Sequence, residues 1–176
     1  ADAEAFAAAW QRLTGASARP AMRTRLHRLG TLIPPKVPPG RARLAGAGDR
    51  GLLIAWFDAF QAEIHAGVRD GNEAMVDDRI SFGGITIWEL DGVPVSMAGV
   101  TRPAAGAVRV APVYTPPELR GHGYAAAVTA AVTRAALDAG AGDVVLFTDV
   151  ANPTSNALYE RLGFRPVEDR TVWEFG

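Results

Sequence analysis

Residues 113–126 read Val-Tyr-Thr-Pro-Pro-Glu-Leu-Arg-Gly-His-Gly-Tyr-Ala-Ala, and this stretch decides the fold. It joins a predicted strand, Val108–Tyr114, to an alanine-rich predicted helix from Gly123 to about Ala139. Gly121 and Gly123 can adopt the positive φ of a tight turn and let a ligand come close to the backbone. The helix start beyond them offers unpaired N–H groups and the positive end of the helix dipole. The stretch therefore predicts an anion site suited to a pyrophosphate.

Two other interpretations of this loop stay open. The glycines can simply form a turn that starts a helix. The segment Gly121–Ala126 also matches the G-x-G-x-x-G/A fingerprint of dinucleotide-binding folds. That fingerprint normally opens the first βαβ unit and precedes an acidic residue about 20 residues later. Here the loop follows several antiparallel elements, and no second βαβ half has room to follow Asp149, which disfavours the nucleotide interpretation.

The elements after the loop complete a β-α-β-α-β pattern. Gly140 marks the end of the alanine-rich helix, and Asp143–Asp149 predicts a strand. A short helix follows at Pro153–Leu162. Two closing strands, Phe164–Val167 and Thr171–Phe175, are predicted to form a last hairpin.

Upstream of the loop the pattern indicates antiparallel hairpins. Asp91-Gly92 is a tight-turn dipeptide between two runs typical of paired strands. Pro112 lies inside a predicted strand; because proline donates no ladder hydrogen bond, it marks an edge, a bulge or a local separation of strands. Asp49 is a suitable helix N-cap. The predicted elements are a strand at Arg41–Ala45, helices at Arg50–His65 and Glu73–Ile80, and strands at Ile85–Leu90 and Val93–Val100.

The first 40 residues look separate from the rest. Residues 31–40 contain four prolines, which forbid a helix or a central strand and predict a stiff linker. Before them, Ala3–Leu13 predicts a helix and Ala21–Leu29 a half-buried strand. We therefore expect an N-terminal appendage at residues 1–40 and a domain at residues 41–176. Its fold class is α/β (α+β), with a mixed, mostly antiparallel sheet and flanking helices.

The composition excludes several classes of function. The chain has 18 basic and 19 acidic residues, a balance that argues against a nucleic-acid surface. It has no cysteine, which excludes disulfides and thiolate chemistry, and its three histidines have no metal-ligand spacing. No apolar run could span a membrane, and the acidic start is not a secretory signal, so we expect a cytoplasmic protein. The missing initial Met favours a fragment of a longer protein.

Two motifs, in order, resemble the GNAT superfamily of acyl-CoA-dependent N-acyltransferases. The run Arg120-Gly121-His122-Gly123-Tyr124-Ala125 fits the superfamily's loop, written Arg/Gln-x-x-Gly-x-Gly/Ala. The segment Asn152–Phe164 fits its second marker, an Asn followed by a helix that carries a Tyr and then by Gly-Phe. The resemblance is firm over Val113–Phe164 and extends more weakly back to about Arg41. It does not cover residues 1–40, which we interpret as the tail of a preceding half, as in tandem members.

The resemblance implies an acetyl-CoA site between splayed strands. The pantetheine lies where the strand before the loop separates from the next strand, and it pairs with backbone groups there. Amides of the loop and of the helix start hold the pyrophosphate, and Asn152 contacts the cofactor arm. The cofactor-binding residues it implies are Val113, Tyr114, Thr115, Arg120, Gly121, His122, Gly123, Tyr124, Ala125, Ala126, Asn152 and Tyr159.

Tyr159 and Asp149 are the candidate catalytic residues. By the resemblance, the Tyr159 hydroxyl protonates or stabilises the departing CoA thiolate, while packing on its own helix is the alternative. Some relatives carry a Glu in the strand before Asn152, where this chain has Phe147. Asp149 points to the same face two residues later, so it is our candidate base or amine anchor. A turn role at the strand end is equally compatible.

The function expected is an N-acetyltransferase that passes an acetyl group from acetyl-CoA to a primary amine by direct attack in a ternary complex. The acceptor is a small-molecule or peptide amine whose identity the sequence leaves open. The alternative is a GNAT-like module that binds acyl-CoA with weak or no transfer, because Phe147 stands where relatives have an acid.

Overall fold

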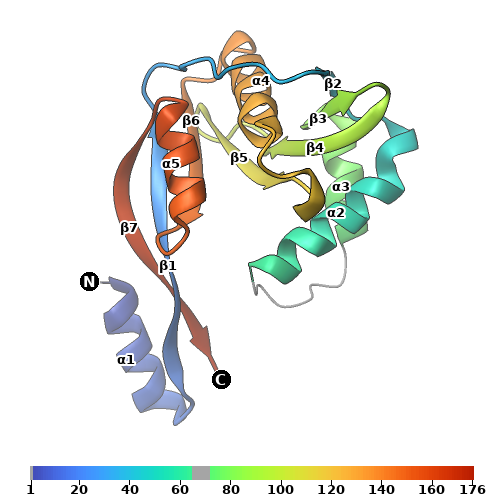
Figure 1. Ribbon diagram of the computed structural model, residues 1–176. Helices are drawn as coiled ribbons and strands as arrows, with labels where there is room; N and C mark the ends of the chain where they lie inside the picture. Colours follow the sequence, from blue (N-terminus) through green and yellow to red (C-terminus); the bar gives the residue numbers. More distant parts are fainter. Residues whose placement is uncertain (1, 65–71) are drawn as a thin grey trace.

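The computed structural model describes residues 2–64 and 72–176, which form one seven-stranded sheet with helices on both faces (Figure 1). The elements are α1 (Asp2–Thr14), β1 (Ala18–Leu29), β2 (Arg41–Leu44), α2 (Arg50–Glu63), α3 (Asn72–Ser81), β3 (Ile85–Leu90), β4 (Val93–Val100), β5 (Ala107–Tyr114), α4 (Tyr124–Asp138), β6 (Asp143–Asp149), α5 (Pro153–Arg161) and β7 (Phe164–Phe175). The strand order is β2-β3-β4-β5-β6-β1-β7.

Neighbouring strands are antiparallel except β5 and β6, which run parallel. The parallel pair is joined by α4, as a crossover connection requires. The expected fold class is confirmed: a mixed, mostly antiparallel sheet with flanking helices and a β-α-β-α-β ending. His65, the predicted end of α2, lies outside the described residues.

The β3–β4 hairpin forms where the sequence predicted it. Asp91 and Gly92 have φ values of 50° and 81°, and two consecutive positive φ values match the right-handed twist of the paired strands. Pairing of Ile85 with Gly99 and of Leu90 with Val93 closes the hairpin along its full length.

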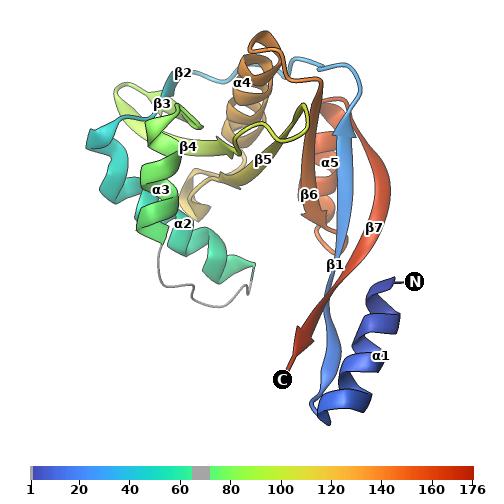
Figure 2. The ribbon, with the colours of Figure 1, turned by 180° about the vertical axis from the view of Figure 1, so that it is seen from behind.

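Two hydrophobic cores cover the two faces of the sheet. On one face, α4 packs Ala127, Val128 and Val132 against strand residues that include Val110 and Leu146. On the other face, α2 and α3 pack over β3, β4 and the end of β5, as the view from behind shows (Figure 2). Residues that bury this second core are Ala45, Leu53, Trp56, Phe57, Val76, Ile85, Ile87, Met97 and Tyr114.

The N-terminal strand β1 is built into the sheet, although we expected residues 1–40 to be an appendage. It pairs with β6 on one side and with β7 on the other, and His27 on it is completely buried. The proline-rich segment 31–40 has no helix or strand, as predicted, and runs across the upper part of α4 to β2 (Figure 1). It is fixed by hydrogen bonds from Ile33 N to Leu162 O (2.9 Å) and from Trp88 Nε1 to Pro39 O (3.0 Å).

The predicted closing hairpin is wrong, because β7 is one continuous strand. We expected two strands, Phe164–Val167 and Thr171–Phe175, with a break between them at residues 168–170. Instead, Asp169 accepts hydrogen bonds from Arg25 (2.7 and 3.0 Å) and from Arg23 (3.1 Å) on the paired strand β1. Cross-strand ion pairing therefore replaces a turn, and residues 168–170 include no glycine or proline to make one.

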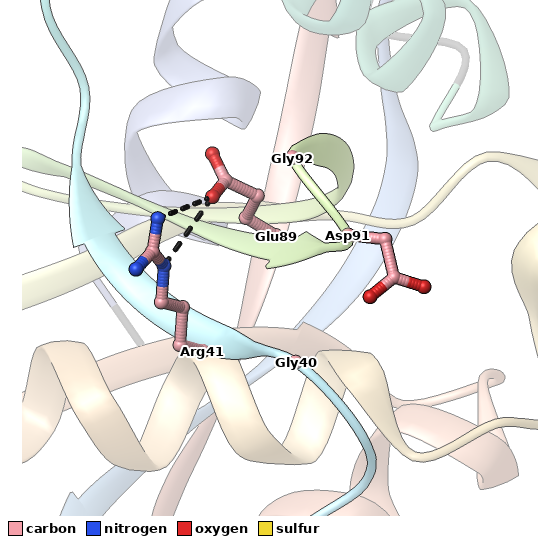
Figure 3. A pocket seen from close by; sticks show the side chains of 5 residues that line it. All are labelled: Gly40, Arg41, Glu89, Asp91 and Gly92. Carbon is pink, nitrogen blue, oxygen red and sulfur yellow. Dashed lines mark hydrogen bonds and ion pairs between the residues drawn. The ribbon is translucent and has the colours of Figure 1, made fainter.

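Asp49 stands at the N-cap of α2, but its carboxylate does not cap the helix. It accepts from Arg43 (2.7 and 2.8 Å) and from the Gly46 amide (2.8 Å), and the Arg43 guanidinium lowers the pKa of Asp49. Arg43 and Arg41 also bind Glu89 on β3, beside a pocket of about 310 Å³ (Figure 3). This pocket lies at the β2–β3 edge, and the Glu89 carboxylate in it is paired with Arg41 and Arg43. The three side chains therefore fasten β2 to the sheet.

Candidate active site

The parallel strands β5 and β6 separate after a short stretch of pairing. They pair only between Ala107–Arg109 and Asp143–Val145. Beyond that point β6 continues beside β1, while β5 continues beside β4. The register of β4 and β5 shifts between Ala98 and Val100, opposite the turn of backbone around Pro112. The predicted splay is therefore present, and Pro112 lies at an irregularity in the ladder.

The start of α4 presents a row of free amides beside this gap. Gly121 and Gly123 have φ values of 81° and 85°, and a Cβ at either position would meet nothing within 4 Å. Among the described residues, the backbone N–H groups of the six residues from Gly121 to Ala126 find no acceptor; the first amide to bond is Ala127 N, to Gly123 O (3.1 Å). Residues 121–123 are exposed. This is the geometry of an anion site at a helix N-terminus.

Side chains near the loop hold it in shape. Arg120 Nε donates to the Thr115 carbonyl (2.9 Å), and its Nη2 pairs with Glu63 at the end of α2 (2.5 Å). The His122 ring stacks on Tyr124 with centroids 5.5 Å apart, and its Nδ1 donates to the Leu119 carbonyl (3.2 Å). Arg120 therefore anchors the loop in this structure, a role that the sequence did not indicate.

Several groups at the end of β5, where the pantetheine was expected to pair, already make hydrogen bonds within the protein. The Ser96 hydroxyl on β4 donates to the Tyr114 carbonyl (3.0 Å) and lies 2.8 Å from the Thr115 hydroxyl. Val113 and Tyr114 also pair with Ala98 and Met97. Sequence analysis missed Ser96, because a serine in a hairpin strand carries no pattern that distinguishes it.

Tyr159 lies on α5, on the same face of the sheet as α4. It is half-buried and meets Phe164 edge to face, with ring centroids 6.1 Å apart. No hydrogen-bond partner for its hydroxyl exists among the described residues. Burial raises the pKa of Tyr159 to about 12, so the phenol keeps its proton at neutral pH.

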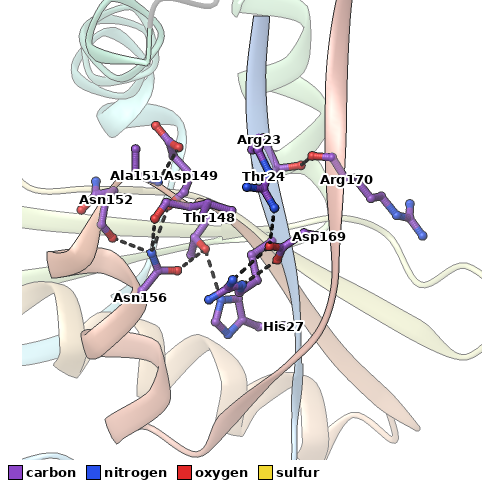
Figure 4. A network of polar contacts seen from close by, with 12 residues as sticks. Arg23, Thr24, His27, Thr148, Asp149, Ala151, Asn152, Asn156, Asp169 and Arg170 are labelled. Atoms are coloured by element: carbon purple, nitrogen blue, oxygen red, sulfur yellow. Dashed lines mark hydrogen bonds and ion pairs between the residues drawn. The ribbon is translucent and has the colours of Figure 1, made fainter. Parts of the chain in front are cut away.

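Asn152 caps α5. Its Oδ1 accepts from Ser155 N (3.0 Å) and Pro153 follows it, which is the arrangement of a helix N-cap with proline at the first helical position. The more extensive contacts belong to Asn156, whose Nδ2 donates to the carbonyls of Asp149, Val150 and Asn152 (Figure 4). Asn156 therefore fixes the β6–α5 turn.

Asp149 is an exposed residue at the end of β6. Its Oδ1 accepts from Ala151 N (2.8 Å), which is the turn role that the sequence left open. Because Thr148 contacts Asn156 on α5, the alternation of the strand directs Asp149 to the opposite face (Figure 4). The two candidate catalytic residues thus lie on opposite faces of the sheet, with the separated strands between them.

Within residues 2–64 and 72–176, no three His, Asp or Glu side chains gather into a metal site. No helix in these ranges has the length and apolar character needed to cross a membrane.

Comparison with known proteins identifies the family. Residues 52–164, more than half of the chain, match the Acetyltransferase (GNAT) family. No curated protein sequence matches the chain. Among solved structures, a GCN5-related N-acetyltransferase from Sphaerobacter thermophilus has a TM-score of 0.74 at 19% identity, covering 98% of this chain and 56% of that one.

Two further structures share the fold. An acetyltransferase of the GNAT family from Colwellia psychrerythraea gives a TM-score of 0.68 at 14% identity, over 95% of this chain and 60% of that one. AAC(6')-Iy in complex with the bisubstrate analogue CoA-S-monomethyl-acetylneamine gives 0.61 at 20% identity, over 75% and 94%. This chain thus spans a little over half the length of the first two structures. With the family match and the fold in agreement, the chain belongs to the GNAT family of acetyltransferases.

Proposed function

We propose that this chain is an N-acetyltransferase that passes the acetyl group of acetyl-CoA to a primary amine by direct attack in a ternary complex. The observation that carries the proposal is the row of free amides from Gly121 to Ala126 beside the gap between β5 and β6. A diphosphate fits the amides, and an extended thioester arm fits the gap. A solved relative binds a bisubstrate analogue that contains CoA, which agrees with this proposal.

The residues fit acetyl-CoA as follows. Amides of Gly121–Ala126 would hold the pyrophosphate, assisted by the dipole of α4. Backbone groups of Val113, Tyr114 and Thr115 would pair with the pantetheine, mainly through N–H groups, because the carbonyls of Tyr114 and Thr115 already accept hydrogen bonds. Bound acetyl-CoA supplies the acetyl group and a thiolate leaving group. A backbone N–H near Val113 would stabilise the oxyanion.

Tyr159 would stabilise the leaving thiolate. Its pKa of about 12 lies well above the roughly 8.5 expected of a thiol, so complete proton transfer from the phenol to the sulfur is uphill. The useful contribution of Tyr159 is therefore a hydrogen bond donated to the sulfur as negative charge develops.

Asp149 would act on the amine. Most lysine-like amines are protonated at neutral pH, since their pKa is about 10.4, and must lose a proton before attack. On the face opposite Tyr159, the Asp149 carboxylate can attract the ammonium group and accept its proton directly or through water. In this arrangement the amine reaches the acetyl group from one side of the gap, and Tyr159 contacts the sulfur from the other.

The proposal is tested by heating the protein with acetyl-CoA. A ligand at 100 times its Kd stabilises the native state by about 2.7 kcal/mol, which corresponds to roughly 5–10 °C in Tm for a chain of this size. Release of free thiol in the presence of amines then measures transfer. The alternative, a GNAT-like module that binds acyl-CoA without efficient transfer, predicts the Tm shift without thiol release. An unchanged Tm at millimolar acetyl-CoA contradicts both.

The remaining expectations stay proposals. A cytoplasmic location would accompany the use of acetyl-CoA. The division of the chain at residue 40 is also a proposal. It has to account for β1, which precedes residue 40 and lies between β6 and β7 in the sheet.

A further inference from the structure

Two arginines without a carboxylate partner gather on the amine-facing side of the gap. Arg79 reaches there from α3, and Arg109 lies on β5 at the last position paired with β6. Among the described residues, neither has an acidic side chain within ion-pair distance, whereas Arg25, Arg43 and Arg170 nearby do. The two guanidinium groups contact a backbone carbonyl and aromatic rings, and among the described residues their charges have no anionic partner.

Arg79 is held against the sheet at the ladder irregularity. Its Nη1 donates to the Ala111 carbonyl, and its guanidinium lies 5.7 Å from the centre of the Phe57 ring. Gly99 makes room for it, since a Cβ there would stand 2.5 Å from Nη1. Burial lowers the pKa of Arg79, and the charge of nearby Arg109 lowers it further. One donor is thus used, and the charge is partly desolvated and repelled by a second cation.

Arg109 lies over Phe147, with its guanidinium 4.9 Å from the ring centre. No side-chain hydrogen bond from Arg109 is present within the described residues, so its five N–H donors are unoccupied there. Phe147 stands at the position where some relatives carry an acid. The Arg170 guanidinium also lies over this ring, 5.7 Å from its centre, and Asp149 follows two residues later on the same face of β6.

Along this face, positive charge stands at one end and negative charge at the other. Asp149 suits an ammonium group, Phe147 an apolar stem, and Arg109 with Arg79 an anion. Guanidinium groups bind carboxylates through two parallel hydrogen bonds, which gives both affinity and orientation. A neutral or polycationic amine would leave the two arginines facing only solvent and each other.

We infer that the amine acceptor carries a carboxylate, as an amino acid or an acidic peptide does, and that Arg109 and Arg79 bind this carboxylate while the amine lies near Asp149. The inference rests on the proposed function. Arg109 and Arg79 are specificity-determining residues in this assignment.

The test compares amines that differ only in the carboxylate. A series of ω-amino acids of increasing length is paired with alkylamines of the same carbon count, whose amine pKa values are similar. Binding to the ¹⁵N-labelled protein saturated with coenzyme A is followed through the arginine Nε–Hε signals, assigned with Arg109→Gln and Arg79→Gln. Acetylation rates of the same compounds give kcat/KM. Arg134→Gln, on the exposed side of α4, is the matched control.

We expect at least one amino acid to shift the Arg109 signal saturably while its alkylamine does not. Arg109→Gln should weaken that binding and lower kcat/KM about tenfold or more, and Arg109→Lys should restore part of it, because lysine keeps the charge and loses the bidentate geometry. Arg134→Gln should change neither. Equal binding of both series, no saturable shift of the arginine signals, or preference for an aminoalkyl phosphate over every amino acid would each overturn the inference.

The outcome is separable from that of the proposed function. Arg109→Gln leaves the amides of α4 untouched, so the Tm increase caused by coenzyme A should persist in the variant. If coenzyme A does not raise the Tm of the wild-type protein, the proposed function itself is contradicted. A retained increase together with no carboxylate preference contradicts only the carboxylate site.

Discussion

The hydrogen bonds around His27 fix the tautomer of its buried ring in the neutral form. Asn156 Nδ2 donates to three carbonyls, so its Oδ1 must be the acceptor of the Thr148 hydroxyl proton (2.6 Å). Thr148 then has no second proton, and His27 Nε2 must donate to its oxygen (3.2 Å). Nδ1 is therefore the unprotonated nitrogen, buried without a partner in the described residues. A residue of the N-terminal strand thus supports the turn that starts α5.

Stability should fall in mild acid because of His27. Burial lowers the pKa of His27 below its usual value of about 6.5, so the unfolded chain binds the proton first as pH decreases. Its contribution is present above pH 6.5 and is lost as pH falls from there through the folded-state pKa. His27→Gln can still donate to Thr148 but does not titrate. Urea unfolding at pH 7.5 and 5.5 should show a smaller acid loss in the variant, and an equal loss would contradict the assignment.

Tyr159→Phe should separate chemistry from folding. The hydroxyl has no protein partner in the described residues, so its removal should change the free energy of unfolding by less than about 0.5 kcal/mol. If it donates to the leaving sulfur, kcat should fall about 100-fold with acetyl-CoA affinity unchanged. Single-turnover thiol release and a CoA titration measure the two quantities. Full activity in the variant would remove the role of Tyr159.

At the scale of elements, the sequence predicted the helices and strands whose bounds are set by residues within the same segment. The β3–β4 hairpin, α4 and β6 appeared within a residue or two of their predicted bounds, because turn residues, helix caps and apolar periodicity act within each segment. The loop geometry followed from Gly121 and Gly123 alone. The contacts of Arg120 with Glu63 and of Ser96 with Tyr114 did not, since each joins segments far apart in sequence. The contacts of Asn156 are local, but no sequence pattern distinguishes them.

Gly123→Val should abolish CoA binding, while its cost in stability should equal that of the same substitution at Gly140. Gly123 precedes α4 and Gly140 follows it, with φ values of 85° and 89°. A Cβ at either position would meet no atom within 4 Å. Valine at either position should cost about 1–3 kcal/mol in backbone strain. Only Gly123 borders the free amides, so only Gly123→Val should remove the acetyl-CoA shift in Tm. Equal loss in Gly140→Val would mean that strain, not crowding of a diphosphate, is responsible.

At the scale of the whole molecule, sheet order was the feature that the sequence could not provide. Nothing in Ala18–Leu29 specifies β6 and β7 as its neighbours, because strand alternation encodes a face and not a partner. The proline-rich segment suggested a boundary, yet the strand before it lies inside the sheet. Similarly, β7 is continuous at residues 168–170 because Asp169 pairs with Arg23 and Arg25, and this pairing depends on β1 lying beside β7.

Deleting β1 should therefore unfold the C-terminal part of the sheet. Without residues 1–30, β7 loses its ladder partner and Asp169 its cations, while Thr148 loses His27. Deleting only residues 1–15 removes α1, which contacts the sheet end through Phe6 and Trp10 against Phe175, all partly exposed. We expect residues 16–176 to unfold cooperatively and to bind coenzyme A, whereas residues 31–176 should show a broadened transition and lose binding.

This comparison decides whether residue 40 is a domain boundary. A strand edge exposed on β6 by the deletion would also favour association between chains, so light scattering should accompany the unfolding measurement. If residues 31–176 instead unfold in one sharp transition and keep the acetyl-CoA shift, β1 is dispensable and the division at residue 40 holds. If they do not, the strand between β6 and β7 is part of the folding unit that positions α5, Asn156 and Tyr159.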